Sequence, residues 1–242
     1  PLKEVNYSYQ LGSDGTSPVD VDYVGDSSAK NGFHSFNDYD DALEMASLDN
    51  NNDAVLLGGV AYATARADLQ YIVNLPISLR TVDALVAKRN SLGINSKYAY
   101  IVSGGITIFD PITSARVNKT EVADVIALAS KAAQDFGAWY SFAGPNRGIL
   151  SGVLGVVNNY GSPAVYGDLN TLANRQINMV ITRNNNTVLW GNHSGQLLNN
   201  QESFNNVVRL VLSMKKSLNP TLETFIAEPN DIATRKRMFY TV

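Results

Sequence analysis

The chain has 242 residues, with 19 basic and 22 acidic side chains, a formal net charge of −3 and no cysteine. The lack of cysteine excludes disulfides, thiolate zinc sites, iron–sulfur clusters and cysteine nucleophiles. Hydrophobic residues make up 45% and charged residues 17% of the sequence, which is enough apolar material for a core and too little charge for a disordered chain. No run of about 18 apolar residues is present, so we expect no membrane insertion.

Charge is distributed unevenly along the chain. Residues 1–53 contain two lysines and 11 acidic residues, a net charge of −9, whereas residues 54–242 contain 17 basic and 11 acidic residues, a net charge of +6. Solvated acidic loops would produce this asymmetry, and so would two structural units or a polar contact between copies. We expect one unit at residues 1–53, packed on the rest or ending a protruding or inserted domain, and a second at residues 54–242.

The N-terminal part of the sequence passes from turns to helix, strand and helix. Residues 1–35 are rich in glycine, serine and aspartate, which predicts irregular structure with short strands. Asn37 is a candidate N-cap for a helix that ends before residues 49–53. The apolar residues 55–59 are typical of a buried strand, and the alanine-rich residues 60–69 favour a helix.

Strand and helix patterns then alternate. Residues 71–73 and 98–102 predict strands, and the helix between them is expected to start at Ser78 and to stop at Gly93. After a turn at residues 110–111, the chain is expected to re-enter a helix.

That next helix is expected to start with a capping-box-like pair, Asn118 and Glu121. Residues 137–167 contain too many glycines and prolines for one regular element, so we expect an ordered loop region there.

The C-terminal third predicts a hairpin and a long helix. Residues 176–183 and 187–190 form a hairpin pattern around three asparagines. Residues 204–218 have helical periodicity and are followed by Pro220, and residues 221–242 predict a further helix or strand. The alternation of strands and helices indicates an α/β fold, with a mixed sheet flanked by helices and an irregular, β-rich acidic N-terminal segment.

Motifs of catalysis and ligand binding are weak. The glycine-rich loop from Gly144 to Gly155 lacks the lysine of a phosphate-binding loop, and residues 49–53 lack the later ligands of a calcium loop. His193 lies in a polar Asn-Gly-Ser context, where a solvated histidine is commoner than a general base. The basic cluster at residues 235–237 is small for a nucleic-acid interface. We therefore expect no cofactor, no metal and no nucleic acid, and no enzyme activity.

Several short segments follow one another from Tyr100 onward: WYSFAGPNRG at residues 139–148, and then INM, LWGN, NVVRL and AEPND. In content and order, these segments resemble the contractile tail sheath proteins of myoviruses, which are similar to the sheaths of R-type pyocins and type VI secretion systems. The segment at residues 139–148 is the most recognisable part. Among the known branches, the giant phages similar to phiKZ are the expected one. The matching positions are Trp139, Gly144, Pro145, Asn146, Arg147, Gly148, Asn178, Trp190, Gly191, Arg209, Glu228, Pro229 and Asn230.

The resemblance implies a structural subunit that stacks in hexameric rings around an inner tail tube and contracts to drive the tube through the host envelope for genome ejection. Its implied partners are other sheath subunits, the tube protein, the baseplate and the tail terminator. Its implied location is the virion, after synthesis in the host cytoplasm. In the family, terminal arms add strands to neighbouring subunits. We expect this chain to be truncated before the arm-bearing C-terminal domain and to be monomeric.

Two departures from the family pattern, His193 and Val208, affect whichever contacts those positions make. Within the loop at residues 139–148, we expect Arg147 to pack or pair and so to fix a rigid conformation, the alternative being a plain surface charge. Two other functions stay open. One is an α/β enzyme or small-ligand-binding domain that uses His193 or the loop from Gly144 to Gly155, and the other is a receptor-binding module.

Overall fold

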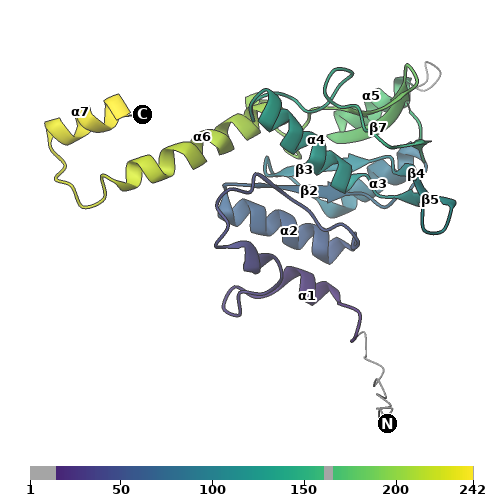
Figure 1. The fold of residues 1–242 in the computed structure, drawn as a ribbon, viewed down its shortest axis with the longest axis horizontal. Helices are drawn as coiled ribbons and strands as arrows, with labels where there is room; N and C mark the ends of the chain where they lie inside the picture. Colours follow the sequence, from purple (N-terminus) through teal and green to yellow (C-terminus); the bar gives the residue numbers. More distant parts are fainter. Residues whose placement is uncertain (1–14, 161–165, 242) are drawn as a thin grey trace, which may run out of the picture.

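A five-stranded mixed sheet with the strand order β1-β2-β3-β7-β8 forms the centre of the molecule (Figure 1). The computed structural model describes residues 15–160 and 166–241. The first four strands run parallel, and β8 pairs antiparallel with β7. These strands are β1 (Glu44–Met45), β2 (Gln70–Asn74), β3 (Ala99–Ser103), β7 (Ile177–Arg183) and β8 (Asn186–Trp190).

A small antiparallel sheet with the order β5-β4-β6 lies beside the large one. Its strands are β4 (Ile106–Asp110), β5 (Ala115–Lys119) and β6 (Gly155–Val156). The helical elements, in chain order, are α1 (Asp20–Val24), the 3-10 turn η1 (Gly32–Phe36), α2 (Asp53–Arg66), α3 (Val82–Leu92), α4 (Val122–Asp135), α5 (Tyr166–Asn174), the 3-10 turn η3 (Gln201–Ser203), α6 (Asn205–Glu223) and α7 (Ile232–Thr241). The chain thus has the expected mixed α/β architecture.

Both faces of the large sheet are buried. On β2, Tyr71 and Val73 belong to the core that includes residues of α2, α3 and α5, whereas Ile72 belongs to the core that includes residues of α4. Successive side chains on β3 and β7 are divided in the same way, because side chains alternate across a strand. Two-sided burial explains why these strands read as continuous apolar runs. In the described part of the chain, no helix has the length and apolar character needed to cross a membrane.

The expectations for the acidic segment were largely wrong. Residues 20–24 form helix α1 instead of a strand, and the helix expected after Asn37 is replaced by coil and the short strand β1. The side chain of Arg66 donates hydrogen bonds to the carbonyl oxygens of Phe36 (2.6 Å) and Tyr39 (2.9 Å). Lys216 also donates to the Asp40 carbonyl. These side chains take the carbonyl groups that a helix would have used.

Residues 55–59 are the first half of α2, not a strand. Both glycines of this run face neighbouring elements at very short range. A Cβ atom on Gly59 would lie 2.2 Å from the ring of Tyr71, and one on Gly58 would lie 2.7 Å from Val24. The run is apolar because α2 is packed between β2 and α1. A short apolar run of this kind looks the same in a buried helix and in a buried strand, so its periodicity did not distinguish the two.

Three expected helix boundaries were also wrong. Thr81, not Ser78, caps α3, with its Oγ1 accepting from the Ala84 amide at 3.2 Å. Asn118 lies in β5, where Thr107 donates to it at 2.8 Å, so α4 starts later, at Val122. Pro220 lies inside α6, which continues to Glu223.

Other expectations are confirmed. In the β7–β8 hairpin, Arg183 pairs with Asn186 across the turn. Helix α3 ends at Gly93, which has the left-handed conformation. The strands near residues 71–73 and 98–102 are β2 and β3. The strands expected within residues 1–14, and the part of the loop region at residues 161–165, lie outside the described residues. The division of the chain at residue 53 stays a prediction.

Glu121 is a fully buried carboxylate at the start of α4. Its Oε2 accepts from the Gly105 amide at 3.1 Å, whereas its Oε1 has no hydrogen-bond partner. Burial raises the pKa of Glu121 to about 7, and the charge of Asp124, which pairs with Lys119, adds to the rise. Between pH 4.5 and about 7, the folded protein thus favours the protonated form of Glu121, whereas the unfolded chain favours the carboxylate.

This shift makes stability depend on pH in a defined direction. Because the folded pKa lies above the unfolded value, the contribution of Glu121 is fully present below pH 4.5 and is lost as the pH rises through about 7. Glu121→Gln should remove this loss and raise the free energy of unfolding at pH 8 by up to about 3 kcal/mol. Urea unfolding at pH 5 and pH 8 measures the effect. An equal effect of the substitution at both values would contradict it.

Candidate functional site

The side chain of Arg209 lies at the centre of the contacts between four segments. It is completely buried, and its Nε donates to Oε1 of Glu44 on β1 at 2.6 Å. Its two Nη atoms donate to the carbonyl oxygens of Ala129 on α4 (2.9 Å) and Tyr140 (3.3 Å). Its guanidinium lies 4.9 Å from the ring centroid of Phe142. Each nitrogen of this buried guanidinium therefore donates a hydrogen bond, as burial of a charge requires.

The segment from Gly137 to Leu150, here called the loop, lies along the outer edge of β8. The Gly144 amide donates to the Leu189 carbonyl, and the Leu189 amide donates to the Gly148 carbonyl, both at 2.8 Å. The Leu150 amide donates to the Thr187 carbonyl at 2.9 Å. The loop thus satisfies an edge that would otherwise be free to pair with another chain.

Gly148 is required for this close approach. A Cβ atom there would lie 2.8 Å from the Gly144 nitrogen and from the Leu189 carbonyl oxygen. Gly144 has a φ of +91°, a conformation that L side chains rarely adopt. The two glycines of the recognisable segment are therefore explained by backbone geometry. Their amides are also engaged, since the Gly148 amide donates to the Gly144 carbonyl at 2.8 Å, so they are not free to bind an anion.

Arg147 fixes the outer side of the loop. Its Nε donates to the Ser141 carbonyl at 2.7 Å, and its guanidinium lies 5.6 Å from the ring centroid of Phe136 and 5.2 Å from that of Tyr140. Phe136, Tyr140 and Trp139 are all half-exposed and lie ring to ring at 5.8 and 6.4 Å. We call these four residues the aromatic patch. Exposed aromatic and arginine side chains on a rigid base are typical of protein interfaces.

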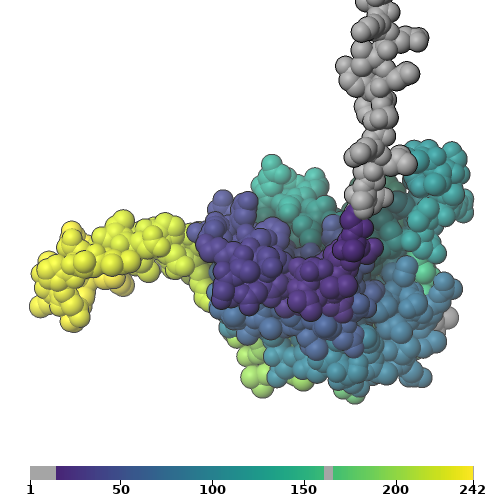
Figure 2. Space-filling view, turned by 90° about the horizontal axis from the view of Figure 1, so that it is seen from below, coloured from purple at the N-terminus to yellow at the C-terminus, as the bar shows by residue number. Residues whose placement is uncertain are grey.

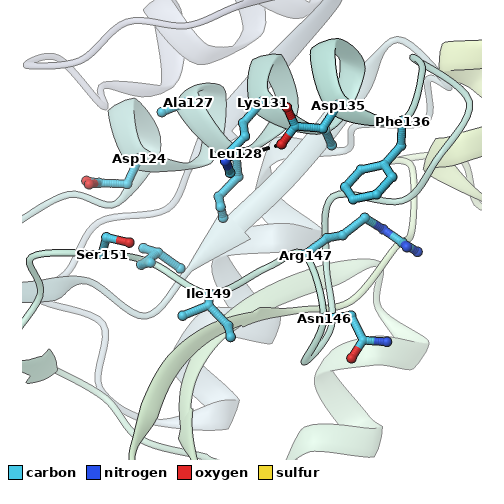
Figure 3. Close-up of a pocket in the computed structure, with 12 residues that line it drawn as sticks. Asp124, Ala127, Leu128, Lys131, Asp135, Phe136, Asn146, Arg147, Ile149 and Ser151 are labelled. Carbon is cyan, nitrogen blue, oxygen red and sulfur yellow. Dashed lines mark ion pairs between the residues drawn. The ribbon is translucent and has the colours of Figure 1, made fainter.

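A groove of about 450 Å³ runs between α4 and residues 146–151, next to the aromatic patch (Figure 3). In Figure 3, Phe136 and Arg147 lie close together at one end and Ser151 lies at the other. Lys131 and Asp135 form an ion pair at 3.2 Å along its rim. The lining is largely apolar with mixed charges on the rim, which suits a protein side chain better than a charged small molecule.

Asn178 in β7 and Gly191, directly after β8, pack against each other at one end of the hairpin. Asn178 is fully buried and donates through Nδ2 to the carbonyl oxygens of Ile101 and His193, both at 2.9 Å. Its Oδ1 accepts from the His193 amide at 2.9 Å. A Cβ atom on Gly191 would lie 2.5 Å from this Oδ1. The hairpin is thereby locked onto β3, and the ring of Trp190 is covered by Arg183 at 4.8 Å.

His193 faces a separate, shallow cavity of about 320 Å³ near α5. Its ring stacks on that of Phe204 at 6.1 Å, and burial lowers its pKa. The described residues that line this cavity include no acidic side chain that could orient the imidazole as a base. In the described part of the chain, no group of three or more His, Cys, Asp or Glu side chains could hold a metal ion.

Glu228, Pro229 and Asn230 lie far from the loop, in the link between α6 and α7. Glu228 accepts from Arg237 at 3.0 Å, and Asn230 accepts from Arg235 at 2.8 Å. Figures 1 and 2 show that the C-terminal part of α6 projects from the body of the molecule, with α7 beyond its end. The residues singled out from the sequence are therefore spread over the loop, the β7–β8 hairpin, the buried start of α6 and the link between α6 and α7. Sequence reasoning missed Glu44 and Phe142, which complete the Arg209 site.

Comparisons with known proteins identify the fold. No protein-family model and no curated protein matches the chain. Among solved structures, the sheath complex of an extracellular contractile injection system (PVC, contracted state) has a TM-score of 0.69 at 16% identity and covers 85% of this chain and 54% of its own. The contracted helical sheath of the anti-feeding prophage has a TM-score of 0.64 at 17% identity, with 82% and 52% covered.

The sheath tail protein from Desulfitobacterium hafniense has a TM-score of 0.54 at 13% identity, with 84% of this chain and 44% of that chain covered. The chain spans about half the length of these structures. It therefore has the fold of contractile sheath proteins over the part that it covers.

Arg209→Met should lower the free energy of unfolding by about 3–5 kcal/mol, because it leaves the Glu44 carboxylate buried without its partner. The double variant Arg209→Met, Glu44→Gln should recover part of this loss, because it also removes the uncompensated charge. Urea unfolding of both variants measures the difference. Equal stability of the single and double variants would show that the ion pair does not connect these elements.

Arg147→Ala should lower the free energy of unfolding by about 1–2 kcal/mol, because it removes one hydrogen bond and two ring contacts. Lys131→Ala is the matched control in the same groove, since its pair with Asp135 is exposed and is worth about 0.5 kcal/mol or less. Thermal unfolding of both variants distinguishes them. An unchanged melting temperature for Arg147→Ala would make Arg147 a plain surface charge.

Proposed function

We propose that the protein is a structural subunit of a contractile sheath, polymerising around an inner tube and contracting to drive that tube through a target envelope. The single observation that supports this most is the sheath fold, which extends over 82% and 85% of the chain in the two contracted sheaths described above. The motif order from residue 139 onward supports the same function independently. Its partners would be further sheath subunits, an inner tube and a baseplate.

The rigidity of the loop region suits such a role. A sheath subunit must move as a unit between two packings, because a lattice with two states of different free energy stores work only if its parts do not deform. Arg209 ties the loop to α4, α6 and β1, and Arg147 bonds to Ser141 within the loop and lies over the ring of Phe136 at the end of α4. The aromatic patch therefore presents a fixed shape, which lowers the entropy cost of binding a neighbour.

We further propose that the sheath is that of a phage tail, located in the virion and used for host entry. The resemblance to myovirus sheaths supports this location, with giant phages similar to phiKZ as the branch. Sheaths of phage-like injection systems have the same fold, so the location rests on the sequence motifs. An enzyme that uses His193 or the loop from Gly144 to Gly155 has less support, because the amides of Gly144 and Gly148 are already bonded within the protein.

Electron microscopy tests the proposal directly. The complete product of the reading frame that encodes this chain is expressed, purified and imaged in negative stain. Striated tubes are expected, because a head-to-tail interface that does not close produces an open helical assembly. The Arg209→Met variant should form fewer tubes.

Monodisperse monomers of the complete product would contradict the proposal. A small molecule that raises the melting temperature would then support the binding-domain alternative, since a ligand that binds only the native state must stabilise it.

A further inference from the structure

Arg89 lies on the face of α3 where an apolar residue is expected. The buried residues of this helix are Leu85, Arg89 and Leu92, which follow one another at positions i, i+4 and i+7 and so share one face. Leu85 and Leu92 belong to the core that α3 shares with α5. Arg89 itself is only 3% exposed. A charged side chain on the buried face of a helix requires compensation by its surroundings.

The fold compensates the charge of Arg89 poorly. Its Nη2 donates to the Gly195 carbonyl at 3.3 Å, which is long for such a bond, and its Nε is buried without a hydrogen-bond partner. In the described part of the chain, Arg89 forms no ion pair. The other buried arginine, Arg209, donates from all three nitrogens and pairs with Glu44. Arg89 is therefore a buried cation without a counter-charge, which is an unfavourable state.

Arg175 is a second cation without a counter-charge, close enough for its charge to act on the first. It follows α5 directly, and α5 packs on α3. Within residues 15–160 and 166–241, its side chain donates no hydrogen bond and joins no ion pair. Burial lowers the pKa of Arg89 and the charge of Arg175 lowers it further, with no carboxylate of the described residues acting against them. A bound anion would relieve both the burial and the repulsion.

The cavity of about 320 Å³ described above lies next to both arginines in the chain. Its lining includes Gln196, which follows Gly195, and Asn174 and Gln176, which flank Arg175. None of the described residues that line it is acidic. Oε1 of Gln176 is buried without a hydrogen-bond partner, so the lining also contains an acceptor for a hydroxyl group. The cavity therefore offers space for a small anion and no negative charge to repel it.

We propose that Arg89 and Arg175 form a binding site for an oxyanion of the phosphate type, which reaches them from this cavity. Guanidinium groups bind phosphate through charge-assisted hydrogen bonds, and the Nε of Arg89 is a donor that the fold leaves unused. Near neutral pH, inorganic phosphate also carries a hydroxyl group, for which Oε1 of Gln176 is the acceptor. The site goes beyond the proposed sheath function and does not depend on it.

Thermal unfolding of the 242-residue chain tests the site. The protein is purified in a chloride buffer without phosphate and melted at increasing concentrations of inorganic phosphate, with the ionic strength held constant by sodium chloride. We expect the melting temperature to rise as the site fills, because a ligand that binds only the native state stabilises it. Exclusion of phosphate from the protein surface also stabilises proteins, so substitutions must show which arginines carry the effect.

Arg89→Met and Arg175→Gln should each raise the phosphate concentration needed for a given rise by at least about tenfold, since each removes a charged donor. Arg175 is exposed, so its substitution tests the site even if Arg89→Met fails to fold. Arg116→Gln is the matched control, because Arg116 is an exposed arginine on β5 of the small sheet. It should leave the response to phosphate unchanged.

The two buried arginines should differ in the buffer without phosphate. Arg89→Met should leave the melting temperature unchanged or raise it, because it removes a buried charge that has no counter-charge. Arg209→Met should lower it, because it leaves Glu44 without its partner. On addition of phosphate, the melting temperature of the wild-type chain should rise relative to that of Arg89→Met.

An equal response to phosphate in the wild-type chain and in both site variants would overturn the proposal. So would a loss of stability in Arg89→Met, without phosphate, as large as that in Arg209→Met, since Arg89 would then be compensated within the chain. The sheath function is tested separately by the tubes of the complete product. Tubes without a specific response to phosphate would overturn this site alone, and a specific response without tubes would contradict the sheath function alone.

Discussion

The ion pair between Arg209 and Glu44 is the interaction on which the arrangement of the molecule depends. It brings together α6 and β1, which are 165 positions apart in the sequence, and the same guanidinium also binds α4 and the loop. A buried cation stays in place only while all of its partners do, since removal of one leaves an uncompensated charge. Arg209 therefore links the start of α6 to β1, α4 and the loop, in addition to the backbone hydrogen bonds that hold the loop on β8 and the lysine contacts along α6.

The faces of the large sheet and its edge at β8 are covered by different parts of the chain. Both of its faces are covered, and the outer edge of β8 is paired with the loop. The surfaces available to partners therefore include side-chain surfaces, such as the aromatic patch and its groove, and the exposed edge strand β5 of the small sheet. Where subunits meet through side-chain surfaces, they can exchange one packing for another without breaking backbone pairing, as a contractile lattice would require.

The sequence was informative where one local rule determined the structure. The asparagine turn and the alternating strands around it predicted the β7–β8 hairpin, and Gly93 and the apolar spacing predicted α3. The loop was also expected to be rigid, on the strength of its Gly-Pro-Asn-Arg-Gly segment. Arg147 has the contacts that this expectation requires, with the Ser141 carbonyl and the Tyr140 ring, and the rigidity itself stays a prediction.

Sequence reasoning failed where distant residues decided the outcome. Residues 55–59 belong to a helix whose apolar run resembles a buried strand, because Gly58 and Gly59 bring it close to Val24 and Tyr71 on two neighbouring elements. The helix expected after Asn37 is absent because Arg66 and Lys216 bind the carbonyl groups there. Glu44 looked like one more acid in a solvated segment, and no local signal marked it as the partner of Arg209. Asn118 was interpreted as a cap because Glu121 follows it three residues later. Its hydrogen bond with Thr107 on the neighbouring strand β4 is not visible in that spacing.

The central claim is that this chain forms the sheath wall of a contractile particle, and its location within such a particle tests it most directly. Purified particles from the producing cells would be labelled with antibody fragments against α4 and then reconstructed by electron cryomicroscopy. The account expects label at every subunit along the tube, with the loop, α4 and β8 packed as described here. Label confined to fibres or to one end of the particle, or particles without a sheath, would contradict it.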